Sequence, residues 1–85
     1  MSEAPTAVGR ELFVRHARRG GKSVAILRAV DFGASCVVEA QVFPPTAPAG
    51  TTAGPYKFTD ARQATMFVTE AVEALMSLGC DVQAA

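Results

Sequence analysis

The sequence predicts an α+β domain over residues 10–80, in which a four-stranded antiparallel β-meander is followed by one C-terminal helix (β-β-β-β-α). Three observations support this prediction. Two β-branched runs flank a short glycine turn within residues 22–43, and a basic segment ends in a double glycine at 20–21. An apolar pattern of helical period then begins after Asp60. With 85 residues, the chain is long enough for one small core.

Residues 10–19 (RELFVRHARR) are compatible with a strand or with a helix. A helix is slightly favoured by propensity, and the two glycines would end it. However, a ten-residue helix with one weak apolar stripe is marginal. A strand gives each apolar residue a neighbour in the sheet and makes Gly20-Gly21 a tight hairpin turn. We therefore expect a strand.

The middle of the chain predicts a hairpin, a loop and a short strand. Residues 22–32 and 36–43 alternate in the manner of strands and are joined by a turn at Gly33. Residues 44–55 contain four prolines and two glycines without periodicity, which predicts a loop. The following YKFT segment, residues 56–59, is expected to form an edge strand.

The last element is predicted to be a helix over residues 61–78. Asp60 is a suitable N-cap, Gln63 stands in the capping-box position, and Gly79 ends the helix. Its apolar sector is wider than the stripe of about 100° that a helix buries against one surface. The excess predicts a homodimer, the alternative being that the loop at 44–55 covers this flank. The predicted dimer interface consists of Val68, Val72, Leu75 and Met76.

The two terminal segments and the two cysteines bear on the cellular location of the protein. Residues 1–9 and 81–85 are expected to be tails, the first of them disordered. No signal-peptide pattern and no apolar run of about 20 residues is present, which predicts a cytoplasmic protein without a membrane span. Cys36 and Cys80 form neither a disulfide framework nor a metal-binding spacing. We therefore expect reduced thiols, no metal and no cofactor.

Charge is distributed unevenly along a chain whose net charge is zero. Residues 10–28 hold six cations against one acid, a net charge of +5, whereas residues 29–85 hold two cations against six acids, a net charge of −4. The basic cluster RHARRGGK, residues 15–22, would lie at a hairpin tip, where cations can bind phosphates. The predicted nucleic-acid-binding residues are the cations Arg15, Arg18, Arg19 and Lys22, with Phe13 and Tyr56 as stacking groups.

This order of elements, together with the RHARRGGK hairpin and the aromatic-basic YKF at residues 56–58, resembles the four-strand-plus-helix unit of the Whirly and PUR-repeat group of single-stranded nucleic-acid binding proteins. The resemblance covers residues 10–80 and is one of topology. It implies a pair of units joined with the help of their helices.

No pattern of catalytic residues is present. GGKS, residues 20–23, resembles the end of a phosphate-binding P-loop, but the required earlier glycine is His16. The sequence also suggests no activated serine or cysteine next to His16. We therefore expect a non-enzymatic domain that binds single-stranded DNA or RNA, without a small-molecule substrate. The alternative is a protein-interaction or regulatory subunit that uses the apolar helix flank.

Overall fold

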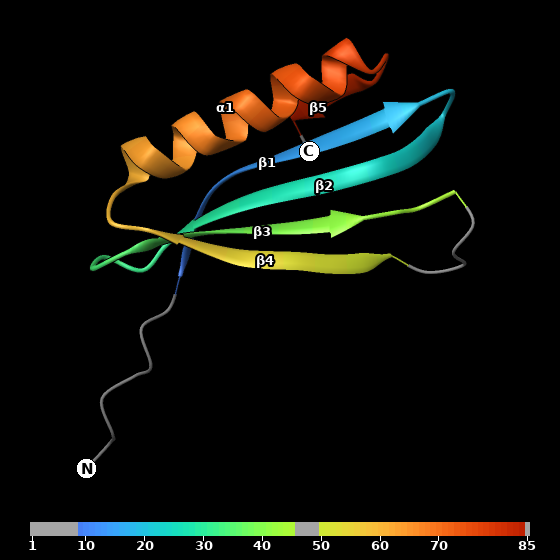
Figure 1. The fold of residues 1–85 in the computed structure, drawn as a ribbon. Coiled ribbons are helices and arrows are strands. Elements are labelled where there is room, and N and C mark those ends of the chain that lie inside the picture. Colours follow the sequence, from blue (N-terminus) through green and yellow to red (C-terminus); the bar gives the residue numbers. More distant parts are fainter. Residues whose placement is uncertain (1–8, 46–49, 85) are drawn as a thin grey trace.

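The computed structural model describes residues 9–45 and 50–84. Its five strands form one antiparallel sheet in the order β4-β3-β2-β1-β5, and a single helix crosses one face of that sheet (Figure 1). The α+β class is confirmed, but the sheet has five strands where the sequence predicted four. The elements are β1 (Arg10–Arg19), β2 (Lys22–Asp31), β3 (Cys36–Val42), β4 (Thr51–Phe58), α1 (Ala61–Ser77) and β5 (Asp81–Ala84).

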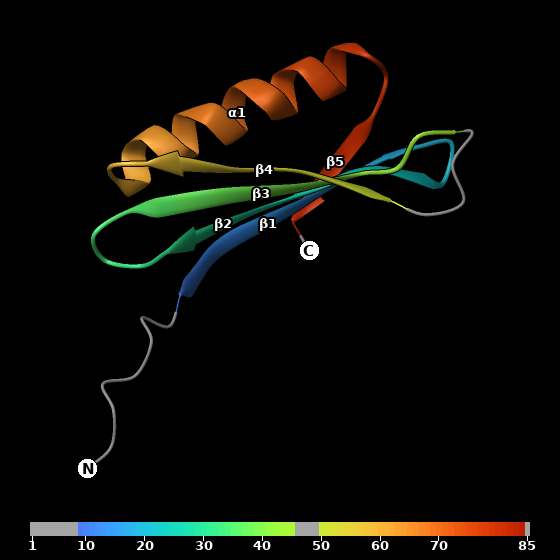
Figure 2. The ribbon, with the colours of Figure 1, turned by 60° about the horizontal axis from the view of Figure 1, so that its bottom comes forward.

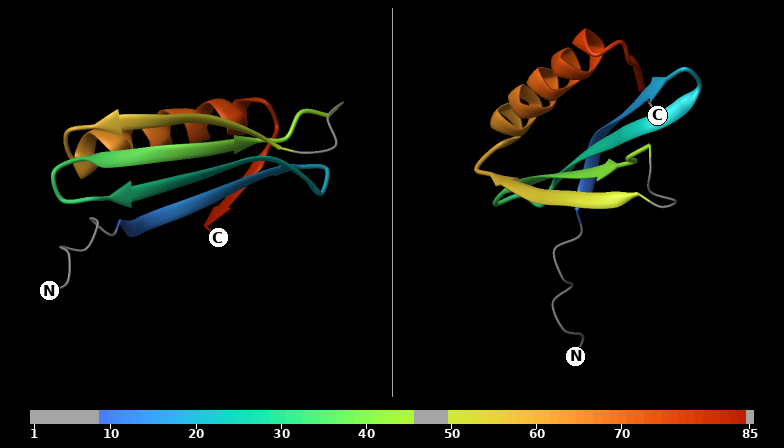
Figure 3. Two further views of the ribbon diagram at one scale, coloured as in Figure 1. Left: turned by 90° about the horizontal axis from the view of Figure 1, so that it is seen from below. Right: turned by 45° about the vertical axis from the view of Figure 1, so that its right-hand side comes forward.

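The fifth strand corrects the predicted C-terminal tail at residues 81–85. β5 pairs antiparallel with β1, with Val82 opposite Ala17, so β1 lies inside the sheet. The helix runs diagonally from the β4 side of the sheet to the opposite side, as the right-hand view of Figure 3 shows. It therefore delivers the chain to the free edge of β1, where Val82 packs near Ala17. Four residues are too few to show a periodic pattern.

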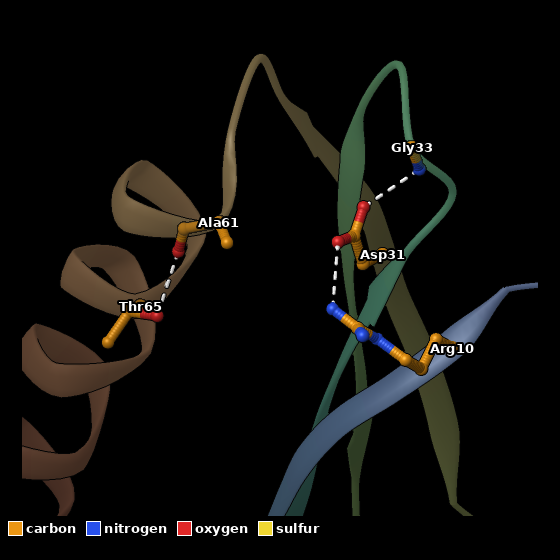
Figure 4. Close-up of polar contacts among 5 residues, drawn as sticks. All are labelled: Arg10, Asp31, Gly33, Ala61 and Thr65. Carbon is orange, nitrogen blue, oxygen red and sulfur yellow. Dashed lines mark hydrogen bonds and ion pairs between the residues drawn. The ribbon is translucent and has the colours of Figure 1, made fainter.

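The two β-hairpins at the start of the sheet confirm the strand interpretation of residues 10–19. Gly20 and Gly21 both have positive φ, 60° and 81°, as a two-residue hairpin turn requires. At the other end of β2, the Asp31 carboxylate accepts a hydrogen bond from the Gly33 amide at 2.8 Å and pairs with Arg10 at 3.5 Å (Figure 4). These contacts fix the direction in which β3 leaves the turn.

β4 corrects the predicted loop at residues 44–55, because the strand begins at Thr51. Gly54 and Pro55 lie inside β4, where the register with β3 shifts. Proline is tolerated there because β4 is an edge strand, as predicted. The predicted disordered tail at residues 1–9 falls outside the described residues except for Gly9, and residues 46–49 of the predicted loop also lie outside them.

α1 begins and ends close to the predicted positions. The Asp60 carboxylate accepts a hydrogen bond from the Gln63 amide at 2.9 Å, which confirms the N-cap. In a capping box the Gln63 side chain would accept a hydrogen bond from the Asp60 amide. Here it accepts instead from the Thr59 hydroxyl at 2.7 Å and from the Thr59 amide at 3.2 Å. At the C-terminus Gly79 has a φ of 92°, and its amide donates to the Met76 carbonyl at 3.0 Å.

The core lies between α1 and the sheet. Val38 and Ala29 are fully buried beneath the helix, and small side chains at many core positions allow the helix to approach closely. α1 contacts all five strands. The wide apolar sector is therefore largely used within one chain: Val68 is 3% exposed, and Phe67 packs against two aromatic rings of β4.

Candidate nucleic-acid interface

The strand register decides which face of the sheet each predicted site residue occupies, because residues directly opposite one another share a face. Arg15 lies opposite Leu27, whose side chain belongs to the core under α1. Arg18 lies opposite Ser23 on the other face, which no helix of the described residues covers (Figure 3, left). We call this second surface the open face. Its strand positions are Glu11, Val14, His16, Arg18, Ser23, Ile26, Arg28, Val30, Val37, Glu39, Gln41, Thr52, Lys57, Asp81 and Gln83.

Arg18 and His16 form a polar cluster on the open face near the hairpin tip. The His16 ring nitrogen Nε2 lies 2.7 Å from Ser23 Oγ, a short hydrogen bond. Two nitrogens of the Arg18 guanidinium lie 3.5 Å and 3.4 Å from the two ring nitrogens of His16. The Arg18 Nε donates to His16 Nε2, and the second contact joins an Arg18 terminal nitrogen to His16 Nδ1. These contacts hold the guanidinium against His16, and Arg18 remains exposed.

Arg19 and Lys22 lie opposite one another on the helix side of the same hairpin tip. Both are exposed. A Cβ at Gly79 would lie 3.7 Å from Arg19 Nε, so the Arg19 side chain lies beside the turn that follows α1. A cation is favourable there because the helix dipole is negative at its C-terminus. The bulge between Ala17 and Arg18 shifts the register of this tip.

The three cations of the tip, Arg18, Arg19 and Lys22, make no ion pair with an acidic side chain in the described part of the chain. The ion pairs found there join Arg10 to Asp31 and Arg28 to Glu11, each at 3.5 Å. Figure 2 shows the β1–β2 turn projecting at the end of the sheet where α1 ends. Asp81 lies opposite Arg18 in the pairing of β1 with β5, but it forms no ion pair with it. The tip therefore presents three exposed cations beside one acidic residue.

Phe13, Arg15 and Tyr56 lie on the helix side of the sheet, away from the predicted sheet-face site. The Phe13 ring is covered by the Arg15 guanidinium, whose carbon lies 4.9 Å from the ring centre. Tyr56 lies opposite the buried Val38, and its ring centre is 4.9 Å from that of Phe67 on the helix. The structure therefore brings Arg18, Arg19 and Lys22 together but separates them from the two aromatic residues.

Among the described residues, no Phe, Tyr or Trp occupies a strand position on the open face. His16 is the aromatic ring that lies there, and it was not among the predicted nucleic-acid-binding residues. Its role depends on the pairing of β1 with β2, which places Ser23 against it. The signal present in the sequence was its spacing of two residues from Arg18, which puts both on one face of a strand.

Cys36 is the titratable group whose environment is most clearly altered. Its side chain is 2% exposed, and this burial is the main cause that raises the pKa of the thiol. The nearby Asp31 carboxylate raises the pKa further, both by its charge and by a hydrogen bond, and Asp60 adds to the effect. Arg10 opposes it. Cys36 is therefore a protonated core thiol rather than a reactive thiolate.

No protein-family model matches the chain, and no curated protein or solved structure matches it. In the described residues, no helix has both the length and the apolar character needed to cross a membrane. Residues 9–45 and 50–84 contain no group of three or more His, Cys, Asp or Glu side chains placed to bind a metal ion.

Proposed function

We propose that the protein is a non-enzymatic cytoplasmic domain that binds the phosphate backbone of single-stranded nucleic acid through the tip of the β1–β2 hairpin. The observation that carries this proposal is the group of three exposed cations, Arg18, Arg19 and Lys22, none of which forms an ion pair with an acidic side chain in the described residues. Polyanions bind such a group because each neutralised phosphate releases condensed counterions.

The arrangement supports backbone contact more than base recognition. Arg18 presents its donors from the open face, and Arg19 and Lys22 present theirs from the opposite side of the same tip. A strand of nucleic acid that passes over the tip contacts all three cations. Tyr56 and Phe13 are directed to the helix side, so neither is placed to stack with a base on the open face. Binding of this kind has little sequence preference.

Salt dependence is the direct test of this proposal. Three phosphate contacts on a single strand give a slope of about −2 for log affinity against log salt. The affinity for a fluorescent oligothymidylate should therefore fall about 20-fold between 50 and 200 mM salt. Arg18→Ala should make the slope about 0.7 less negative.

Arg62→Ala provides the matched control, because Arg62 is an exposed cation near the start of α1 and remote from the tip. This variant should bind with an unchanged slope. Absence of binding at 20 mM salt, or equal losses in Arg18→Ala and Arg62→Ala, would contradict the proposal.

We also propose that the domain forms a homodimer through α1, with a smaller interface than the sequence predicts. Val68 is in the core of its own chain and is left out of this interface. Val72 and Leu75 are half-buried against the sheet, and Met76 is 59% exposed. An exposed methionine next to partly exposed apolar side chains supports a contact between copies, since such patches mark interaction surfaces. This patch, rather than the arginines, is also the surface that a protein partner would use.

A further inference from the structure

A cleft of about 540 Å³ lies beside the hairpin tip on the helix side of the sheet. Three segments that are distant in the sequence form it: the β1–β2 tip, the three residues that follow β3, and the turn between α1 and β5. Its volume is within the range of about 300–1,000 Å³ that is usual for small-molecule sites. The residues that define its chemistry are Arg19, Lys22, Val24, Phe43, Pro44 and Leu78.

Backbone hydrogen bonds hold the walls of the cleft in place. The Phe43 amide donates to the Val24 carbonyl at 2.9 Å, which joins an apolar wall residue of β2 to the residue that follows β3. The Cys80 amide donates to the Leu75 carbonyl at 3.0 Å, which fixes the turn that carries Leu78. Cys80 and Leu75 also pack in one apolar cluster. The site is therefore formed before a ligand arrives.

Leu78 is unusually exposed for a large apolar residue, with 65% of the residue's surface accessible to solvent. It follows the last residue of α1 and lines the cleft together with Phe43. Exposed apolar surface that faces a concave site, rather than being scattered singly, indicates a binding function. An apolar ligand would remove Leu78 and Phe43 from water together.

The charged residues that line the cleft are both cations. Arg19 and Lys22 lie opposite one another at the tip, and none of the described residues that line the cleft is acidic. Arg19 also lies beside Gly79, at the end of α1. An apolar cavity with two cations on one side matches a ligand that has an apolar body and a single anionic group.

We propose that this cleft binds a fatty-acid-type ligand, with the carboxylate between Arg19 and Lys22 and the acyl chain against Val24, Phe43 and Leu78. No sequence pattern indicated a small-molecule ligand, because the lining comes from three separate segments. The proposal is independent of nucleic-acid binding. It shares Arg19 and Lys22 with that proposal but not Arg18, which lies on the open face.

The test is an amide chemical-shift titration of the whole chain with sodium dodecanoate below its micellar concentration. Saturable shifts are expected at residues 22–24, at Phe43 and at residues 78–80. The double variant Arg19→Ala/Lys22→Ala should raise the Kd for dodecanoate about tenfold, because it removes the charge-assisted contacts. Dodecanol, which has the same chain without the charge, should bind this variant and the unchanged protein equally.

Two further variants separate the outcomes. Leu78→Glu should weaken dodecanoate binding at least as much, and because Leu78 is exposed this change is compatible with the fold. Arg18→Ala, the matched loss of one cation from the opposite face, should leave the Kd for dodecanoate unchanged while it reduces oligonucleotide binding. Shifts that do not saturate, shifts centred on the open face, or an equal loss in Arg18→Ala would overturn the proposal. If oligonucleotide binding is absent while dodecanoate still binds as described, the nucleic-acid proposal alone is contradicted.

Discussion

Arg18 and Arg19 are neighbours in the chain but lie on opposite faces of β1. Successive strand residues alternate in direction, so Arg18 contacts His16 at the open face while Arg19 lies beside Gly79 at the end of α1. The basic run therefore presents its cations on two faces of one hairpin tip. Arg18→Ala should weaken nucleic-acid binding alone, whereas Arg19→Ala should weaken the binding of both proposed ligands.

Cys36 shows how burial and neighbouring carboxylates act together on one residue. The thiol is almost fully buried and lies near Asp31, so it stays protonated in the folded state at pH values where an exposed thiol ionises. The unfolded chain has the ordinary thiol pKa of about 8.5 and loses the proton first. The contribution of Cys36 to the free energy of unfolding is therefore constant below that pH and declines as the pH rises toward the raised pKa.

We expect the free energy of unfolding to decrease more between pH 7 and pH 10 in the unchanged protein than in Cys36→Ala. The alanine variant is less stable at pH 7, because it leaves a small cavity, but it lacks the thiol that titrates. Urea unfolding followed by circular dichroism at pH 7, 8.5 and 10 measures the difference. Parallel decreases in both proteins would show that Cys36 does not cause the pH dependence.

The β1–β2 hairpin is the element on which both proposed sites depend. Its two-residue turn requires positive φ at Gly20 and at Gly21. Nothing in the described residues lies within 4 Å of a Cβ added at either position, so only backbone strain opposes a side chain there. The turn can therefore be perturbed without disturbing the packing.

Gly20→Ala should destabilise the protein by about 1 kcal/mol, because alanine is strained in the left-handed region. Gly20→Asn should cost only a few tenths of that, because asparagine adopts this conformation readily and is common at the first position of such turns. Urea midpoints of the two variants, compared at equal slopes, measure the difference. Equal destabilisation by both residues would mean that the turn has another conformation in solution.

At the scale of the whole molecule, α1 and β5 determine which surfaces remain free. The helix carries the chain across the sheet, and β5 then pairs with β1, so the sheet edges are β4 and β5. Most of the apolar sector of the helix is covered by its own sheet. The apolar surface of the helix that the sheet does not cover consists of an exposed flank near Met76 and a separate methionine, Met66, which is 54% exposed.

Light scattering after size-exclusion chromatography tests the dimer that we propose. The unchanged protein should elute with the mass of two chains, and Met76→Lys should shift it toward one chain by placing a charge in the interface. Met66→Lys is the matched control, since it makes the same change on another part of the helix surface, and it should not alter the mass. A one-chain mass for the unchanged protein at high concentration would contradict the dimer.

The elements that depend on local patterns were predicted correctly. Alternating apolar residues indicated β2 and β3, the double glycine indicated the first hairpin, and Asp60 with Gly79 bounded the helix, because turns and caps are set by residues next to one another. β5 and the start of β4 were missed. Four residues of β5 have no readable period, and the pairing of Thr51–Phe58 with β3 overrides a local composition typical of a loop.

The sequence by itself determined an α+β chain with a basic hairpin and one capped helix, since propensity, turn chemistry and charge are properties of short segments. Only the tertiary structure decided which face each side chain occupies. The strand register, with its three shifts, places Tyr56 and Phe13 on the helix side and Arg18 on the open face. The cleft likewise exists only where three distant segments meet. A shift of one residue in strand pairing would move each of these side chains to the opposite face of the sheet. Their faces are therefore determined by contacts between residues that are distant in the sequence.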